Sequence, residues 1–304
     1  MSAIELTAVS RWYGHVVAVN DVTMTIGPGV TGLLGPNGAG KSTLIAMMSG
    51  FLAPSAGSVT LEGAPVWRNE QMYRVVGLVP EREAVFEHLT GRQFVLANAE
   101  LHGLPDPGAA AARAVATVEM ADAEDRQIAT YSKGMRQRIK MAQALVHDPS
   151  VLLLDEPFNG MDPRQRMHMM GLLAQMGDEG RTVLFSSHIL EEVQQVARQI
   201  EVLVAGRHAA SGDFGEIRRL MTDRPNRYVI RSTDDRRLAA ALISDDSARA
   251  VALRPNGGID VEAVDFGRFS WQLPRLSREH GISLLEVSAT DESLESVFSY
   301  LISS

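Results

Sequence analysis

The chain has 304 residues, which is enough for about two domains with full apolar cores. With 45% apolar and 22% charged residues it has the composition of an ordinary globular protein, and the lack of cysteine excludes structural disulfides and thiolate-bound metals. A net charge of −8 gives no reason to expect a general affinity for nucleic acid or anionic lipid. We expect no secretion signal and no membrane span, since no apolar run approaches the ~18 residues that cross a bilayer.

Short β-type runs alternate with helical stretches over the first ~220 residues, which predicts an α/β core with parallel strands. The strands are expected at Val30–Leu34, Val75–Val79, Val151–Leu154, Thr182–Ser186 and Ile200–Ala205. Residues 90–128 are rich in alanine and are interrupted by Leu104–Gly108, which predicts a mostly helical insertion between two core strands. We therefore expect a first domain over residues 1–221, with a helical subdomain at about 88–145.

The pattern changes around Asp223–Asn226, where we expect a domain boundary, and residues 226–304 predict a small accessory domain. Its expected elements alternate between strands and helices: strand Tyr228–Ser232, a helix from Arg236, strand Ala248–Leu253, a turn at Asn256–Gly258, strand Ile259–Ala263, helix Phe269–His280, strand Ser283–Val287 and a last helix after Asp291. This order predicts a two-layer α/β domain of ferredoxin-like type. It contains no cluster of chemically suggestive residues.

A glycine-rich segment follows the first of the predicted core strands. Gly35–Ser42 fits the pattern G-x-x-x-x-G-K-[ST] and opens an amphipathic helix, which is the context that phosphate binding requires. Glycines let backbone N–H groups wrap around phosphates, and the helix N-terminus adds positive potential. We expect Lys41 to reach the β- and γ-phosphates of a nucleotide and the Ser42 hydroxyl to ligate Mg²⁺. The predicted contacts with the nucleotide come from Gly35, Asn37, Gly38, Gly40, Lys41, Ser42 and Thr43.

Two carboxylates, Asp155 and Glu156, end the apolar run Val151–Leu154. Acidic groups at the carboxyl end of a parallel strand lie where open α/β sheets bind ligands, although a pair of acids taken alone also fits a plain strand-end turn. With the phosphate loop present, we expect Asp155 to hold Mg²⁺, directly or through water. Glu156 is then the predicted general base that deprotonates the attacking water.

The segment Tyr131–Arg138 lies about 20 residues before the acidic strand. With the preceding motifs, it resembles the signature stretch, usually L-S-G-G-Q, of the ATP-binding cassette (ABC) family. Tyr131, Lys133 and Met135 depart from that pattern, whereas Ser132 and Gly134 match it. The resemblance implies that these two matching residues contact the γ-phosphate bound by a second subunit.

Three smaller motifs follow the family order. Asp162, in Asn159–Asp162, resembles the D-loop that lines the dimer interface, and its alternative is a plain turn. His188 resembles the switch histidine that contacts the γ-phosphate and the attacking water, so that the expected catalytic residues are Lys41, Glu156 and His188. Tyr13 matches the adenine-stacking position, although Trp12 is an alternative stacking residue and both aromatic side chains also fit the core.

One position departs from the family. The chain has Glu81 after the strand that ends at Val79, where relatives normally have glutamine. A carboxylate ligates Mg²⁺ as readily as an amide carbonyl, but it adds negative charge near the triphosphate. We expect Glu81 to join Ser42 and Asp155 as a magnesium ligand, and the alternative is that it points to solvent.

The resemblance covers residues 3–220 and implies an ATPase that binds ATP and Mg²⁺, works as a homodimer or heterodimer, and drives a separate transmembrane permease at the cytoplasmic face of the cell membrane. The signature, Glu81 and the accessory domain are similar to those of ABC-2 type exporters, which implies efflux of a drug or antibiotic, a lipid or a polysaccharide. The exposed-looking Val85 and Phe86 predict that Glu81–Leu89 and the helical insertion dock the permease.

Two other classes of cassette protein fit the sequence less well. A soluble cassette that acts on ribosomes or DNA is disfavoured, because the chain has one cassette, no sustained heptads and no basic patch, so no nucleic acid partner is expected. An inactive regulatory cassette is disfavoured because Lys41, Asp155, Glu156 and His188 are all present. The accessory domain has two open roles: it regulates or extends the dimer interface, or it is a stabilising appendage.

Overall fold

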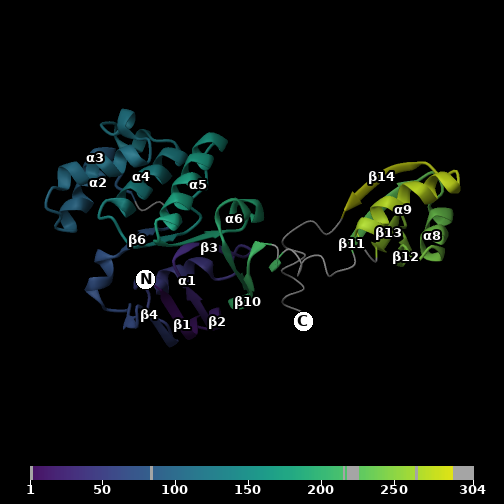
Figure 1. Cartoon of the computed structure of the whole chain (residues 1–304), viewed down its shortest axis with the longest axis horizontal. Coiled ribbons are helices and arrows are strands. Elements are labelled where there is room, and N and C mark those ends of the chain that lie inside the picture. The colour runs from purple at the N-terminus through teal and green to yellow at the C-terminus, as the bar shows by residue number, and fades with distance from the viewer. Residues whose placement is uncertain (1–2, 83–84, 215, 218–225, 264–265, 290–304) are drawn as a thin grey trace. The chain divides into compact units, whose positions relative to one another are not determined.

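A computed structural model of the chain describes residues 3–82, 85–214, 216–217, 226–263 and 266–289. The chain divides into two compact units, Met1–Phe214 and Gly215–Ser304 (Figure 1). The predicted boundary at Asp223–Asn226 lies almost wholly outside the described residues, and the predicted domain limits stay predictions. None of the helices within the described ranges is both long enough and apolar enough to cross a bilayer.

A six-stranded sheet forms the centre of the first unit, and all of its strands except β10 run parallel to their neighbours. Its strands, in spatial order, are β10 (Arg207–Gly212), β9 (Gln199–Val204), β3 (Gly29–Leu34), β8 (Thr182–Ser187), β7 (Val151–Leu154) and β6 (Val76–Val79). The five predicted core strands are confirmed, with each end within one residue. Strand β7 is buried along its whole length, as expected for a parallel strand covered on both faces.

An antiparallel sheet packs below the central sheet in the order β2–β1–β4–β5 (Figure 1). Its strands are β1 (Ile4–Tyr13), β2 (Val16–Ile26), β4 (Ala56–Leu61) and β5 (Ala64–Pro65). Helix α1 (Lys41–Met48) contacts strands of both sheets, and its Leu44 and Met47 are buried in the apolar core that the two sheets share. The core therefore holds the helix that follows the phosphate loop.

The predicted insertion between two core strands is helical and lies between β6 and β7. Helices α2 (Gly91–Leu101), α3 (Pro107–Thr117) and α4 (Lys133–Leu145) pack on one another at one end of the unit (Figure 1). The remaining helical segments are η1 (Glu70–Arg74), η2 (Ala121–Ala123), η3 (Ile128–Thr130), α5 (Pro163–Asp178) and α6 (Leu190–Val196). Side-chain caps begin five of these segments, because the side chain before the first turn accepts a hydrogen bond from one of its free N–H groups; the caps are Asn69, Thr90, Asp106, Ser132 and Asp162.

The second unit has the chain order β11 (Asn226–Ser232), α8 (Asp235–Ser244), β12 (Ala248–Leu253), β13 (Ile259–Ala263), α9 (Phe266–Glu279) and β14 (Leu284–Ala289). The strands form an antiparallel sheet in the order β12–β13–β11–β14. The predicted strand and helix order of this unit is confirmed up to β14, and the helix predicted after Asp291 lies outside the described residues. The ferredoxin-like assignment stays a prediction.

Candidate functional site

The phosphate loop links the end of β3 to the start of α1 and packs tightly against neighbouring backbone. A Cβ atom on Gly35 would lie 2.3 Å from the carbonyl oxygen of Leu203, and one on Gly40 would lie 2.4 Å from that of Ala18. Gly40 also has a φ of +101°, in the left-handed region that favours glycine. The loop therefore needs glycine at both positions, while Asn37 and Gly38 between them are exposed.

Lys41 is the first residue of α1, and its side chain turns back toward the loop. Its Nζ donates hydrogen bonds to the carbonyl oxygens of Gly35 (2.7 Å) and Pro36 (3.2 Å) and lies 3.5 Å from Oε1 of Glu156. The lysine is only 6% exposed, so these acceptors compensate for the loss of water around its charge. The geometry puts one buried cation between the phosphate loop and the acidic end of β7.

The two predicted acids occupy different positions after β7. The Asp155 carboxylate is buried, and Oδ1 accepts a hydrogen bond from the Ser186 hydroxyl at 2.7 Å. That hydroxyl also accepts the backbone N–H of Glu156 at 2.9 Å. Glu156 has a φ of +49°, which is uncommon for a residue with a side chain. Ser186 on β8 therefore fixes the turn that aims both carboxylates.

His188 follows β8, and its Nδ1 lies 3.1 Å from both carboxylate oxygens of Glu156. Glu156 is 7% exposed, and its carboxylate lies close to both the Lys41 ammonium and the His188 imidazole. A carboxylate in this position holds its oxygens at fixed points and can receive a proton from a bound water. The structure thus brings Lys41, Glu156 and His188 together, although they come from three separate segments.

A cavity of about 470 Å³ opens over the phosphate loop. It is lined by Val16, Val17, Ala18, Asn37, Gly38, Ala39, Gly40, Lys41, Ser42, Thr43, Glu81 and Glu156. All predicted nucleotide contacts in the loop except Gly35 therefore line one cavity. Glu81 is exposed and lines the same cavity as Ser42, whereas Asp155 lines a second, more apolar cavity that Ser42 also borders.

The oxygen donors near the cavity suit Mg²⁺. Ser42 offers a hydroxyl, and Glu81 and Asp155 offer carboxylates, which are the hard ligands that this ion prefers. Within the described ranges no three histidine or acidic side chains are grouped closely enough to hold a metal by themselves. Magnesium at nucleotide sites commonly takes one or two carboxylates and completes its shell with phosphate oxygens and water.

Tyr13 ends β1, next to the cavity. It pairs across the hairpin with Val16, a cavity-lining residue, and its side chain is 48% exposed. The Arg11 guanidinium lies 4.9 Å from the centre of the Tyr13 ring. Trp12 is exposed to a similar degree, so both aromatic side chains lie outside the core. The core alternative is therefore wrong for Tyr13 and for Trp12.

The predicted signature residues lie at the start of α4, and the predicted interface residue lies at the start of α5. The Ser132 hydroxyl accepts the N–H of Met135 at 3.2 Å, and Asp162 accepts that of Gln165 at 2.9 Å. A Cβ on Gly134 would lie 2.8 Å from Oε1 of Gln165. None of these residues lines the phosphate-loop cavity of their own chain.

Three residues that the sequence analysis did not select support the site. Ser186 aims the acids, and Gln137 on α4 donates from Nε2 to the carbonyl oxygen of Glu156 at 3.4 Å. Lys140 donates to the carbonyl oxygens of Pro80 (2.6 Å) and Arg82 (3.3 Å), on either side of Glu81. Ser186 had a usable signal, since it is a polar residue that directly follows the apolar run Val183–Phe185, at the carboxyl end of the strand next to β7; the other two had none.

Comparisons with known proteins agree with this geometry. A family model described as "ABC transporter" matches residues 19–159. The chain is 30% identical to the linearmycin resistance ATP-binding protein LnrL of Bacillus subtilis, over 95% of both chains. The chain belongs to the ATP-binding proteins of ABC transporters. It is an ABC ATPase cassette, which binds and hydrolyses ATP.

Other members of the family are similar over comparable lengths. The daunorubicin resistance ATP-binding protein DrrA3 of Streptomyces coeruleorubidus is 32% identical over 99% of this chain and 96% of its own. A solved structure of an ATP-binding subunit of an ABC transporter superposes with a TM-score of 0.65, at 27% identity, and covers 71% of this chain and 92% of its own. The second unit is therefore part of what the full-length relatives share with this ABC protein.

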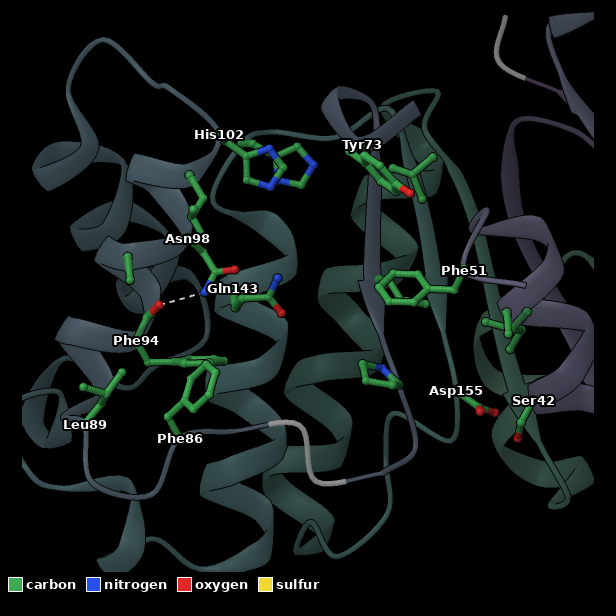
Figure 2. A pocket seen from close by; sticks show the side chains of 18 residues that line it. Ser42, Phe51, Tyr73, Phe86, Leu89, Phe94, Asn98, His102, Gln143 and Asp155 are labelled. Carbon is green, nitrogen blue, oxygen red and sulfur yellow. Dashed lines mark hydrogen bonds between the residues drawn. The ribbon is translucent and has the colours of Figure 1, made fainter. Parts of the chain in front are cut away.

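The cassette also has an apolar groove of about 670 Å³ between the helices of the insertion and the central sheet. Figure 2 shows Phe86, Leu89 and Phe94 on one side of it and Phe51 and Tyr73 on the other. Ser42 and Asp155, two of the magnesium-ligand candidates, lie at one end, and His102 lies at the far end (Figure 2). The groove thus runs from Ser42 and Asp155 to His102, at the C-terminal end of α2.

Two histidines stack at the far end of the groove. The rings of His102 and His147 are parallel, with centroids 3.9 Å apart. Burial, together with a smaller effect of the neighbouring His102, lowers the pKa of His147 to about 4, and burial lowers the pKa of His102. Both rings are therefore neutral in the folded cassette at pH 7.

The low pKa of His147 makes folding sensitive to acid. Below pH 6.5 the unfolded chain binds a proton at His147 that the folded chain does not bind until about pH 4, so stability falls as the pH falls through this window. After allowance for partial exposure, the loss between pH 7 and pH 5 is about 1 kcal/mol. His147→Phe keeps a ring for stacking. Between pH 7 and pH 5 its free energy of unfolding, measured with urea, should fall by about 1 kcal/mol less than that of the unmodified chain. Equal losses in both proteins would contradict this.

Proposed function

We propose that this chain is the ATP-hydrolysing subunit of an ABC-2 type exporter and that it drives efflux of a drug or antibiotic through a permease on a separate polypeptide. The observation that carries the proposal is the similarity over nearly the full length to proteins named for linearmycin resistance, bacitracin transport and daunorubicin resistance, which includes the second unit. A lipid or a polysaccharide is the second class of cargo that this exporter type implies.

The residues around the cavity have separate roles in hydrolysis. The N–H groups of the phosphate loop and the Lys41 ammonium hold the β- and γ-phosphates of ATP. Glu156 accepts the proton of the attacking water, and His188 holds Glu156 and the γ-phosphate in register. Ser42, Asp155 and Glu81 would hold Mg²⁺, which neutralises charge on the phosphates when it is bound. Tyr13 stacks on the adenine.

Two cassettes complete each site. Ser132, Gly134 and Asp162 begin α4 and α5 and do not line the cavity of their own chain, which fits a role on the γ-phosphate and the interface of a second copy. The start of α4 also offers the positive end of a helix to that phosphate. A closed dimer would bury charged groups between paired surfaces, so the cassette should hydrolyse ATP slowly as a monomer. The second cassette is either another copy of this chain or a different chain, depending on the composition of the exporter.

The apolar groove is the proposed seat of the permease. It exposes large apolar side chains, among them Phe86 at 61% and Phe51 at 71%, and a surface of this kind marks a contact with another protein. The groove lies beside Ser42 and Asp155, so a movement of these residues with the nucleotide would change the contacts of a helix bound in the groove. From the predicted docking segment Glu81–Leu89, Phe86 and Leu89 line the groove, and residues 83–84 lie outside the described residues. This seat would place the cassette at the cytoplasmic face of the membrane.

Val85→Asp with Phe86→Asp should lower export by at least about tenfold, because two charges in an apolar contact cost several kcal/mol. The measurement is ATP-dependent efflux from cells that express the cassette with the membrane protein encoded beside it, with daunorubicin and bacitracin as probes. Trp67→Asp changes another exposed aromatic residue outside the groove and serves as the matched control. Unchanged efflux in the double variant would place the docking surface elsewhere, and no efflux with the unmodified chain would remove the exporter function for these probes.

A further inference from the structure

Glu192 is a buried acid on α6 that is bound from two directions. Its carboxylate is 6% exposed. Oε2 accepts a hydrogen bond from the Ser187 hydroxyl at 2.7 Å, and Oε1 lies 3.3 Å from Nη1 of Arg166 on α5. A charge this deeply buried is stable only when it is paired and hydrogen-bonded. Glu192 therefore ties the segment after β8 to the start of α5.

The Ser187 contact acts on His188. Ser187 is the residue immediately before His188, and its hydroxyl also accepts the N–H of Ile189 at 3.0 Å, so the two bonds hold the backbone on both sides of the histidine. The His188 ring in turn lies 3.1 Å from the Glu156 carboxylate. Any shift of Glu192 would move the backbone that carries His188.

The Arg166 contact acts on the loop before α5. Arg166 lies in the first turn of this helix, and its backbone N–H donates to the carbonyl oxygen of Asp162 at 2.9 Å. Asp162 caps the same turn through its side chain. The Arg166 side chain, half-buried, leaves that turn to meet Glu192. A displacement of the loop Asn159–Asp162, here called the Asp162 loop, would thus be transmitted to Glu192 through a single side chain, that of Arg166.

We propose that Glu192 is a positioning residue that couples the Asp162 loop to His188, so that hydrolysis depends on where this loop lies. This inference rests on the proposed function in one respect only, namely that a second cassette contacts the Asp162 loop. The path runs from Asp162 through Arg166, Glu192 and Ser187 to His188, by side-chain contacts of 2.7 Å and 3.3 Å and two short stretches of backbone. Glu192 does not touch the nucleotide cavity.

The test is Glu192→Gln in the full chain, which keeps the size and an acceptor for Ser187 but removes the charge that holds Arg166. Loss of one charge-assisted contact should lower kcat for ATP hydrolysis by about tenfold, with KM for ATP within about twofold of the unmodified chain. Glu191→Gln is the matched control, because Glu191 is the exposed neighbour on the same helix. Arg166→Gln should cause the same loss, and the double variant should be no worse than either single variant, since both break one path.

Three further measurements distinguish a loss of this coupling from a loss of packing, of folding or of the dimer. Arg166→Lys should recover part of kcat, which a loss of packing alone would not allow. Thermal unfolding shows whether Glu192→Gln is folded; if it is not, Ser187→Ala takes its place, with the same expected loss of kcat. ATP-dependent dimerisation of Glu156→Gln should persist when Glu192→Gln is added. A normal kcat, a rise in KM that matches the fall in kcat/KM, or loss of the dimer would overturn the proposal, and none of these depends on which cargo is exported.

Discussion

Glu156→Gln is expected to lower kcat for ATP hydrolysis by about 100- to 10,000-fold, the range for loss of a general base. The amide has nearly the same shape as the carboxylate and can still accept from Lys41, but it cannot take the proton of the attacking water. ATP affinity should stay within a few-fold of that of the unmodified chain, because the phosphate loop is untouched. The measurements are steady-state phosphate release and equilibrium binding of ATP.

The same variant should accumulate as an ATP-bound dimer, because the step that opens the dimer is blocked. Size-exclusion chromatography with and without ATP measures this. Glu179→Gln, at the exposed end of α5, is the matched control and should remain at full turnover. Turnover at the unmodified rate in Glu156→Gln would remove Glu156 as the base and would leave His188 as the nearest candidate.

Lys41→Met is expected to weaken ATP binding by about 10- to 100-fold, because a hydrogen bond from a charged group to a phosphate contributes roughly 1.5–3 kcal/mol. The lysine also donates to the carbonyl oxygens of Gly35 and Pro36 and faces Glu156. The variant therefore leaves three acceptors without their cation and should unfold at a lower temperature as well. Equilibrium binding of ATP and thermal unfolding measure the two effects separately.

Arg113→Met removes a cation from α3, outside the nucleotide cavity, and is the matched control for Lys41→Met. It should bind ATP like the unmodified chain. If Lys41→Met bound ATP with normal affinity, the lysine would only stabilise the loop through its contacts with Gly35 and Pro36, and backbone N–H groups alone would hold the phosphates.

Much of the architecture could be predicted because the relevant signals are local. The apolar run Val151–Leu154 is a strand in a covered parallel sheet, and its sequence shows this without any knowledge of its neighbours. The ends of the five core strands follow for the same reason. The domain boundary was harder to place: the compact units divide after Phe214, and most of the predicted boundary lies outside the described residues.

The sequence by itself predicted a phosphate loop at Gly35–Ser42, because the glycines, Lys41 and Ser42 are contiguous in the chain and follow a single strand. It also marked Asp155, Glu156 and His188 as candidates, but it contained no distances between them. Only the tertiary structure decided that the His188 ring meets the Glu156 carboxylate, since the two lie on neighbouring strands whose register is set by long-range pairing.

The contacts of Ser186 and Glu192 and the groove that ends beside Ser42 also came from the tertiary structure alone. A buried serine, a buried glutamate and an exposed phenylalanine are ordinary residues when they are taken singly, and they acquire a role only from what packs against them. Glu81 lies between these cases. The sequence singled it out as a departure from the family pattern, and the fold places it in the lining of the cavity over the phosphate loop.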